Sequence, residues 1–169
     1  MLLPILAAGL MLAAEDDSSL DPSTPRDVAS AVGDCWNAVS AAGVDKSRLG
    51  ETGWSLVAAT ADLANSPLQV WIKKGANHRI MLTDDVRAAD YCTVITRLSS
   101  KADAEKTLTA MHSTLKSYDA KVTPERTEGG VAFVSLPRFA QVDTFNGAGA
   151  TEDQPSLRII VGYQIPEQS

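Results

Sequence analysis

Two stretches of the chain carry apolar residues at helical spacing. In the first, Thr24 is suited to cap the amino end, Pro25 to occupy the first helical position, and Gly43 to end the element. The stripe of this first helix consists of Val28, Val32, Cys35, Trp36 and Val39. The second helix is predicted over residues 100–118, where Ser100 and Asp103 have capping-box spacing. Its stripe consists of Ala104, Leu108, Met111, Leu115 and Tyr118.

Elsewhere the apolar positions favour strands, in most cases by recurring at every second residue. Strands are predicted at residues 54–59, 68–73, 78–83, 91–97, 131–136 and 157–163. In the second of these, Leu68, Val70 and Ile72 alternate with Gln69, Trp71 and Lys73. This alternation predicts that the first three face the core and that Trp71 lies on the outer face. Residues 121–129 are predicted to be irregular, and residues 141–155 to be a loop.

The order of these elements predicts the fold class. A helix is followed by about four strands, a second helix and two strands, without the βαβα alternation of a parallel sheet. We therefore expect an α+β fold of two layers, with one mostly antiparallel sheet of about 5–6 strands and two main helices packed on one face. No repeat of fixed period is present, and residues 24–169 are expected to form a single domain.

The amino-terminal residues resemble a targeting segment. Residues 1–14 are uncharged and rich in Leu and Ala, and they are too few to span a bilayer, which needs roughly 20 apolar residues. A signal peptide is therefore predicted, although no Lys or Arg precedes the run and Leu12 is large for a cleavage motif. A buried helix or strand is the alternative. Residues 15–23 are acidic and are predicted to be a flexible arm.

Composition and charge narrow the class of partner. The chain has 169 residues, of which 44% are hydrophobic, so it can form an ordinary core. Its net charge of -6 argues against nucleic acid or an anionic membrane as the main partner. Another envelope or secreted protein is the expected partner, with no stable membrane insertion after cleavage of the leader. The oligomeric state is left open.

The two cysteines allow only one pairing, Cys35 with Cys92. Both lie on apolar faces, one in a predicted helix and the other in a predicted strand, so a disulfide would connect the two layers. This prediction depends on export, because cytosolic thiols stay reduced. Two unrelated buried thiols and a redox pair are the alternatives, while two cysteines alone rarely make a zinc site.

No recognised catalytic motif occurs in the sequence. Nucleophile-elbow, phosphate-loop and dinucleotide-binding patterns are missing, and no metal or cofactor is expected. His78 and His112 have no partner at metal-ligand spacing, and Asp84 and Asp85 are read as turn residues. No catalytic residue is predicted.

Three residues near the predicted hairpin are the best candidates for a binding surface. Trp71 is expected on the outer face, close to the cations Lys73 and Arg79, and exposed tryptophan is common at interfaces. The alternative is that an oligomer contact or a loop covers this tryptophan. The leading hypothesis is an exported accessory or binding protein of undetermined specificity, in the periplasm or secreted. A small hydrolase-like enzyme with a dispersed site and an oligomerising structural subunit are the alternatives.

Overall fold

The first helix forms where the sequence predicts its start. The computed structural model describes residues 20–60, 68–83 and 91–164. At the amino end of α1 (Pro25–Ala38), the Thr24 hydroxyl accepts a hydrogen bond of 3.2 Å from the Asp27 backbone N–H, which caps the helix. The helix ends at Ala38, ahead of the predicted stop at Gly43. Gly43 instead has a φ of 98° and lies in a small hairpin, where glycine is the least strained residue.

Three helices form in the described residues. Besides α1, these are α2 (Lys46–Glu51) and α3 (Lys101–Tyr118). At the amino end of α2, the Asp45 carboxylate accepts hydrogen bonds from the N–H groups of Ser47 and Arg48. No helix of the described ranges is long and apolar enough to cross a membrane.

One large sheet contains most of the strands. A separate hairpin pairs β2 (Val39–Ser40) with β3 (Gly43–Val44). The large sheet contains β1 (Pro22–Ser23), β4 (Trp54–Thr60), β5 (Leu68–Lys73), β6 (Arg79–Thr83), β7 (Cys92–Leu98), β8 (Thr123–Thr127), β9 (Gly130–Ser135), β10 (Arg138–Phe145) and β11 (Ser156–Tyr163).

The large sheet is two antiparallel meanders joined at their last strands. Its strand order is β4-β5-β6-β7-β11-β10-β9-β8, and β1 pairs with β7 in parallel. β7 and β11 are antiparallel neighbours, with Thr93 opposite Ile160. Each meander therefore begins at an edge of the described sheet and ends in its middle, with α1 ahead of the first and α3 ahead of the second.

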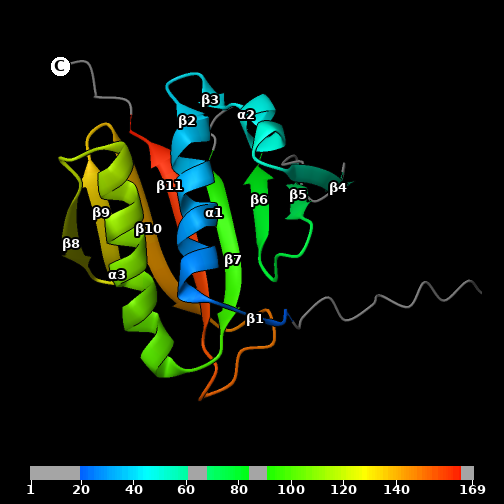
Figure 1. Ribbon diagram of the computed structural model, residues 1–169, viewed down its shortest axis with the longest axis vertical. Coiled ribbons are helices and arrows are strands. Elements are labelled where there is room, and N and C mark those ends of the chain that lie inside the picture. The colour runs from blue at the N-terminus through cyan, green and yellow to red at the C-terminus, as the bar shows by residue number, and fades with distance from the viewer. Residues whose placement is uncertain (1–19, 61–67, 84–90, 165–169) are drawn as a thin grey trace, which may run out of the picture.

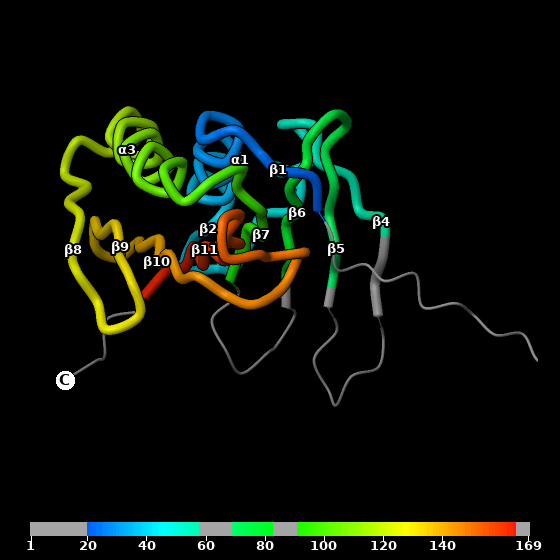
Figure 2. Tube along the Cα trace, turned by 90° about the horizontal axis from the view of Figure 1, so that it is seen from below, coloured from blue at the N-terminus to red at the C-terminus, as the bar shows by residue number. Residues whose placement is uncertain are grey.

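The molecule has two layers. Figure 2 shows α1 and α3 together on one face of the sheet, and the opposite face carries no helix of the described residues. The two helices run in the same direction, both beginning at the lower end of the view in Figure 1. The two helices are in contact at Gly33, where an added Cβ would lie 2.9 Å from Cε2 of Tyr118.

The core lies between the helices and the sheet, and the disulfide crosses it. Cys35 of α1 is bonded to Cys92 of β7, with a Cα–Cα distance of 5.6 Å, and both side chains are fully buried. The predicted pairing is confirmed. The largest fully buried side chains of the core include Trp36 of α1, Met111 of α3 and Phe133 of β9.

The α+β class, the antiparallel sheet and the placement of both long helices on one face agree with the prediction, but the strand count does not. The sheet has 9 strands rather than 5–6. Two of the additional strands, β8 and β10, lie in segments predicted to be irregular or a loop, and a third, β1, lies in the predicted flexible arm. In that arm, Leu20 is buried and Ser23 belongs to a strand. The predicted leader, residues 1–14, lies outside the described residues.

Candidate functional site

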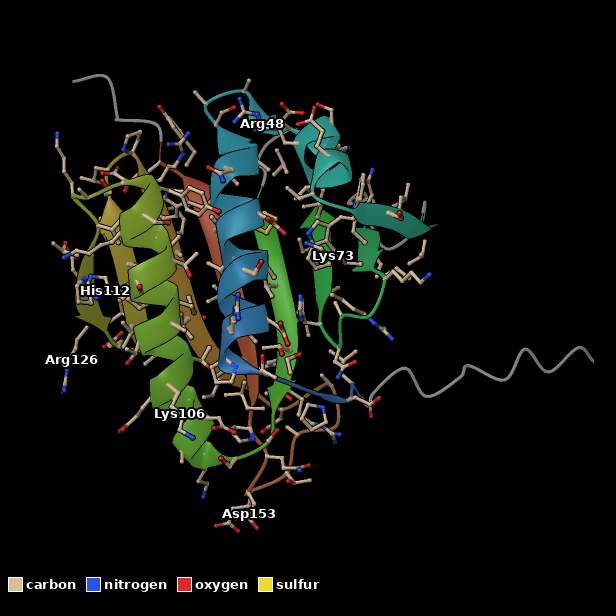
Figure 3. All side chains as sticks on the ribbon, viewed as in Figure 1. Arg48, Lys73, Lys106, His112, Arg126 and Asp153 are labelled. Carbon is tan, nitrogen blue, oxygen red and sulfur yellow. A yellow bond between two sulfur atoms is a disulfide. The ribbon has the colours of Figure 1, made fainter. Side chains whose placement is uncertain are left out.

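A small polar pocket opens between α1 and the turn that joins β5 to β6. It has a volume of about 160 Å³. Its wall is formed by Asp27, Ser30, Ala31, Asp34, Trp54, Lys73, Lys74, Gly75, Ala76 and His78. Asp27, Ser30 and Asp34 line it together because residues three, four and seven apart share one face of a helix. We call this the α1–turn pocket. Figure 3 labels Lys73, which is the last residue of β5.

Asp34 is the centre of the hydrogen-bond network in this pocket. Its Oδ2 accepts a bond of 2.9 Å from Nε1 of Trp54 and one of 3.3 Å from Nζ of Lys73. The Lys73 ammonium also lies 5.8 Å from the centre of the Trp54 ring, within cation–π range. The carboxylate thus has two donors, and these contacts hold β4 and β5 against α1.

His78 is buried at the same place, with only 4% of its surface exposed. Its Nδ1 lies 3.4 Å from Oγ of Ser23, and its ring centre is 5.5 Å from that of Trp54. Burial lowers the pKa of His78 below 6.5, and the Lys73 ammonium acts in the same direction, whereas the carboxylates of Asp27 and Asp34 oppose the shift. A serine and a histidine are paired here, but both side chains are buried, so the pair mainly fastens β1 to the turn.

The three predicted binding residues occupy different environments. Trp71 is only 8% exposed and belongs to the core, so the expectation of an exposed tryptophan on the outer face is wrong. It is Ile72, predicted to face the core, that is 40% exposed. Lys73 and Arg79 both border a hollow of about 350 Å³ around the turn at Gly75. Their role in binding stays a prediction.

A larger groove lies at the other end of the sheet. Its volume is about 680 Å³. It is lined by Tyr91, Glu125, Ala132, Val134, Leu136, Phe139, Tyr163 and Gln164, and we call it the sheet-face groove. Phe139 and Val134 are opposite one another in β10 and β9, and they alternate with buried core residues, so they project from the face without helices. Leu136, at the turn between β9 and β10, is 71% exposed.

Gly162 allows two aromatic rings to meet beside this groove. The rings of Tyr91 and Phe139 are arranged edge to face, with centres 6.2 Å apart. A Cβ on Gly162 would lie 2.5 Å from Cζ of Phe139 and 2.8 Å from Cδ1 of Tyr91. Any larger residue would therefore displace both rings, which makes this glycine part of the groove.

The remaining candidates from the sequence do not form a site in the described residues. His112 stacks on Phe133 at 5.7 Å, and its Nε2 is buried without a hydrogen-bond partner. Figure 3 shows it on the side of α3 nearest β8 and β9. Asp84 and Asp85 lie outside the described residues. Within the described ranges, no group of three or more His, Cys, Asp or Glu side chains is arranged to hold a metal ion.

The sequence did not point to most of the residues that line these two sites. Asp34 lies on a helix of mixed polarity, and its two donors come from strands that are distant in the chain. Phe139 lies in β10, most of which was predicted to be a loop. For the sheet-face groove, a local signal was Gly162, a glycine directly after the unbroken apolar run Ile159–Val161, where an absent side chain can indicate a close approach.

Comparison with known protein families, curated protein sequences and solved structures gives no match to this chain.

Proposed function

We propose that the chain is a non-catalytic accessory protein that binds the apolar part of a ligand in the sheet-face groove. The observation that carries this proposal is the groove itself, with its volume of about 680 Å³. Ligand sites commonly have about 300–1,000 Å³ and are lined by apolar and aromatic side chains with a few polar groups. The α1–turn pocket is smaller, and its best-placed carboxylate already has two donors.

The polar groups of the groove favour one kind of ligand. Glu125 is the charged residue among those that line it, and the Glu125 side chain is exposed. The whole chain also has a net charge of -6, which attracts cations at long range. We therefore propose a ligand with an apolar body and a positively charged group, such as a hydrophobic side chain next to a basic residue of a partner protein.

Binding of a neutral fluorescent probe, N-phenylnaphthylamine, tests the apolar part of this proposal. Leu136→Asp places a charge at the groove while changing an exposed side chain, so folding should be retained. We expect the dissociation constant of the probe to rise about tenfold, because the substitution removes apolar contact. This rise corresponds to a loss of roughly 1.4 kcal/mol of binding free energy. Ile72→Asp is the matched control, because Ile72 is also an exposed apolar residue and does not line the groove.

Two results would contradict the proposed site. One is equal loss of probe binding in the Leu136→Asp and Ile72→Asp variants. The other is a folded wild-type protein that does not bind the probe at all. The charge preference is tested by comparing a cationic and an anionic alkyl ligand of equal chain length, and Glu125→Gln should reduce the advantage of the cationic one.

We also propose that the protein works after export, in the periplasm or as a secreted protein. The Cys35–Cys92 disulfide supports this, because such bonds persist mainly in oxidising compartments. The apolar run at residues 1–14 supports it independently. A small enzyme is the alternative, and the pair of Ser23 and His78 is the arrangement it would use, but the burial of both side chains favours the binding function.

A further inference from the structure

We propose that the positively charged group bound in the sheet-face groove is a quaternary ammonium, which lies between an aromatic pair and a carboxylate. This inference rests on the function proposed above, because it names the chemical class of the cation that the same groove takes. The aromatic pair consists of Tyr91 and Phe139, and the carboxylate belongs to Glu125. All three residues line the groove.

The carboxylate and the aromatic pair lie on either side of β9. Phe133 of β9 belongs to the core, so its neighbours Ala132 and Val134 project from the face without helices. Glu125 of β8 lies opposite Ala132 in the sheet. Phe139 of β10 lies opposite Val134. A ligand that lies over β9 therefore has the carboxylate on one side and an aromatic ring on the other.

The arrangement of the two rings suits a cation. They meet over Gly162, at a point where any Cβ would overlap both of them. Their edge-to-face arrangement, with centres 6.2 Å apart, means that the partner covers only one ring face of the pair. The face of an aromatic ring carries partial negative charge and attracts cations. The pair and Glu125 are thus complementary in charge to the same kind of ligand.

The surroundings favour a methylated cation over a primary ammonium. A primary ammonium is compact and strongly hydrated, and it needs hydrogen-bond acceptors in place of its water. Among the described residues that line the groove, Glu125 is the only charged one, and most of the others are apolar or aromatic. A quaternary ammonium keeps its charge while its methyl groups make apolar contacts, and aromatic rings are the usual means by which proteins bind it.

Two alkyl cations of equal chain length test the proposal. Octyltrimethylammonium and octylammonium both carry a positive charge at pH 7, and they differ in the methyl groups on nitrogen. Isothermal titration calorimetry below the micelle concentration measures their affinities for the full chain. We expect the trimethylated ion to bind at least about fivefold more tightly than the primary one.

Phe139→Leu separates the contribution of the ring from that of the apolar groove. We expect the ratio of the two affinities to fall to about one, while N-phenylnaphthylamine still binds, because leucine keeps much of the apolar contact. Phe139→Tyr retains an aromatic ring and should keep the preference. Phe145→Leu is the matched control, since Phe145 projects from the same face of β10 and does not line the groove. Tyr91→Leu removes the other ring of the pair and should also lower the ratio.

Equal binding of the two cations to the wild-type protein overturns the proposal, as does an unchanged ratio in Phe139→Leu or Tyr91→Leu variants whose circular dichroism spectra show that they are folded. In either case the proposed function stands if the neutral probe still binds and Leu136→Asp weakens it. Absence of probe binding to the wild-type protein contradicts the proposed function itself, so the two failures can be distinguished.

Discussion

His78 is an imidazole whose burial makes its protonation costly. It contacts Ser23 of β1 and Trp54 of β4, and the charged groups that act on it are Asp27 and Asp34 of α1 and Lys73 of β5. The net effect of these surroundings is a lowered pKa, with burial as the largest cause. The folded protein therefore binds a proton at this position less readily than the unfolded chain does.

The free energy of unfolding should fall as the pH is lowered below the unfolded histidine pKa of about 6.5. Above that pH both states are neutral at His78, and its contribution to stability is fully present. Below it the unfolded state is protonated first, so stability decreases by up to about 1.4 kcal/mol per pH unit until the folded-state pKa is reached. Urea denaturation at a series of pH values measures this.

His78→Gln supplies the control for the pH experiment. The difference in unfolding free energy between wild type and this variant should shrink from pH 7 to pH 5. Carboxylates with a lowered pKa, such as Asp119, which accepts a hydrogen bond from the Ser135 hydroxyl, lose their contribution only at more acidic pH. A difference that stays constant from pH 7 to pH 5 would show that His78 titrates as in the unfolded chain.

For single residues, the sequence predicted some side chains correctly as buried and assigned others to the wrong face of the sheet. The burial of Cys35 and Cys92 followed from apolar periodicity, and the structure confirms it. In β5 the same reasoning assigned the wrong face, because Leu68, Val70 and Ile72 are more uniformly apolar than the alternate positions. A tryptophan contributes more buried area than any of these, and the fold places Trp71 in the core.

The packing of α1 on α3 depends on a small residue at their contact. A side chain on Gly33 would meet the Tyr118 ring and Cγ2 of Thr114, the latter at 3.1 Å. Gly33→Leu should therefore lower the unfolding free energy by about 1–3 kcal/mol, the usual cost of overpacking. Urea denaturation of the purified variant measures the loss.

Tyr118→Ala in the Gly33→Leu background should restore part of that stability. The Tyr118 side chain is half exposed, so its removal costs little in the wild-type protein and frees space in the variant. A double-mutant cycle then gives a coupling energy that differs from zero. Strictly additive effects of the two substitutions would contradict this, because they would mean that the side chain at position 33 does not contact Tyr118.

For whole elements, the spacing of apolar residues was enough to predict the two long helices but not all of the strands. α1 and α3 were predicted from stripes of several apolar residues each. β8 has no buried residue, so it has no apolar pattern to detect, and it exists because β9 offers hydrogen-bond partners. Much of β10 was predicted to be a loop, although Ala140 and Val142 are buried between β9 and β11.

The disulfide is the covalent link between the two layers of the whole molecule. It joins residues separated by 57 positions, and for such a loop the chain-entropy model gives a stabilisation of roughly 4 kcal/mol. Replacing both Cys35 and Cys92 by Ala should lower the unfolding free energy by about 2–5 kcal/mol. Guanidinium denaturation with and without reductant measures this, and reductant should have no effect on the double variant.

The arrangement of the complete sheet could not be predicted from the sequence. Within each meander, neighbouring strands are also neighbours along the chain, so local patterns and turns define them. The pairing of β7 with β11 joins a strand from the middle of the described chain to its last strand, and no sequence signal specifies it. The groove depends on this junction, because Tyr91 comes from one side of it and Phe139 from the other.

The central position of β11 also constrains the order in which the protein can be assembled during synthesis. When the ribosome has made the first meander, β7 still lacks its neighbour on one side, and its Val94 and Ile95 have no β11 beside them. In the growing chain, the apolar strand β7 therefore has one unpaired edge until β11, the last described strand, is available. A nascent chain held unfolded by chaperones until translation is complete would avoid pairing of that strand with other molecules.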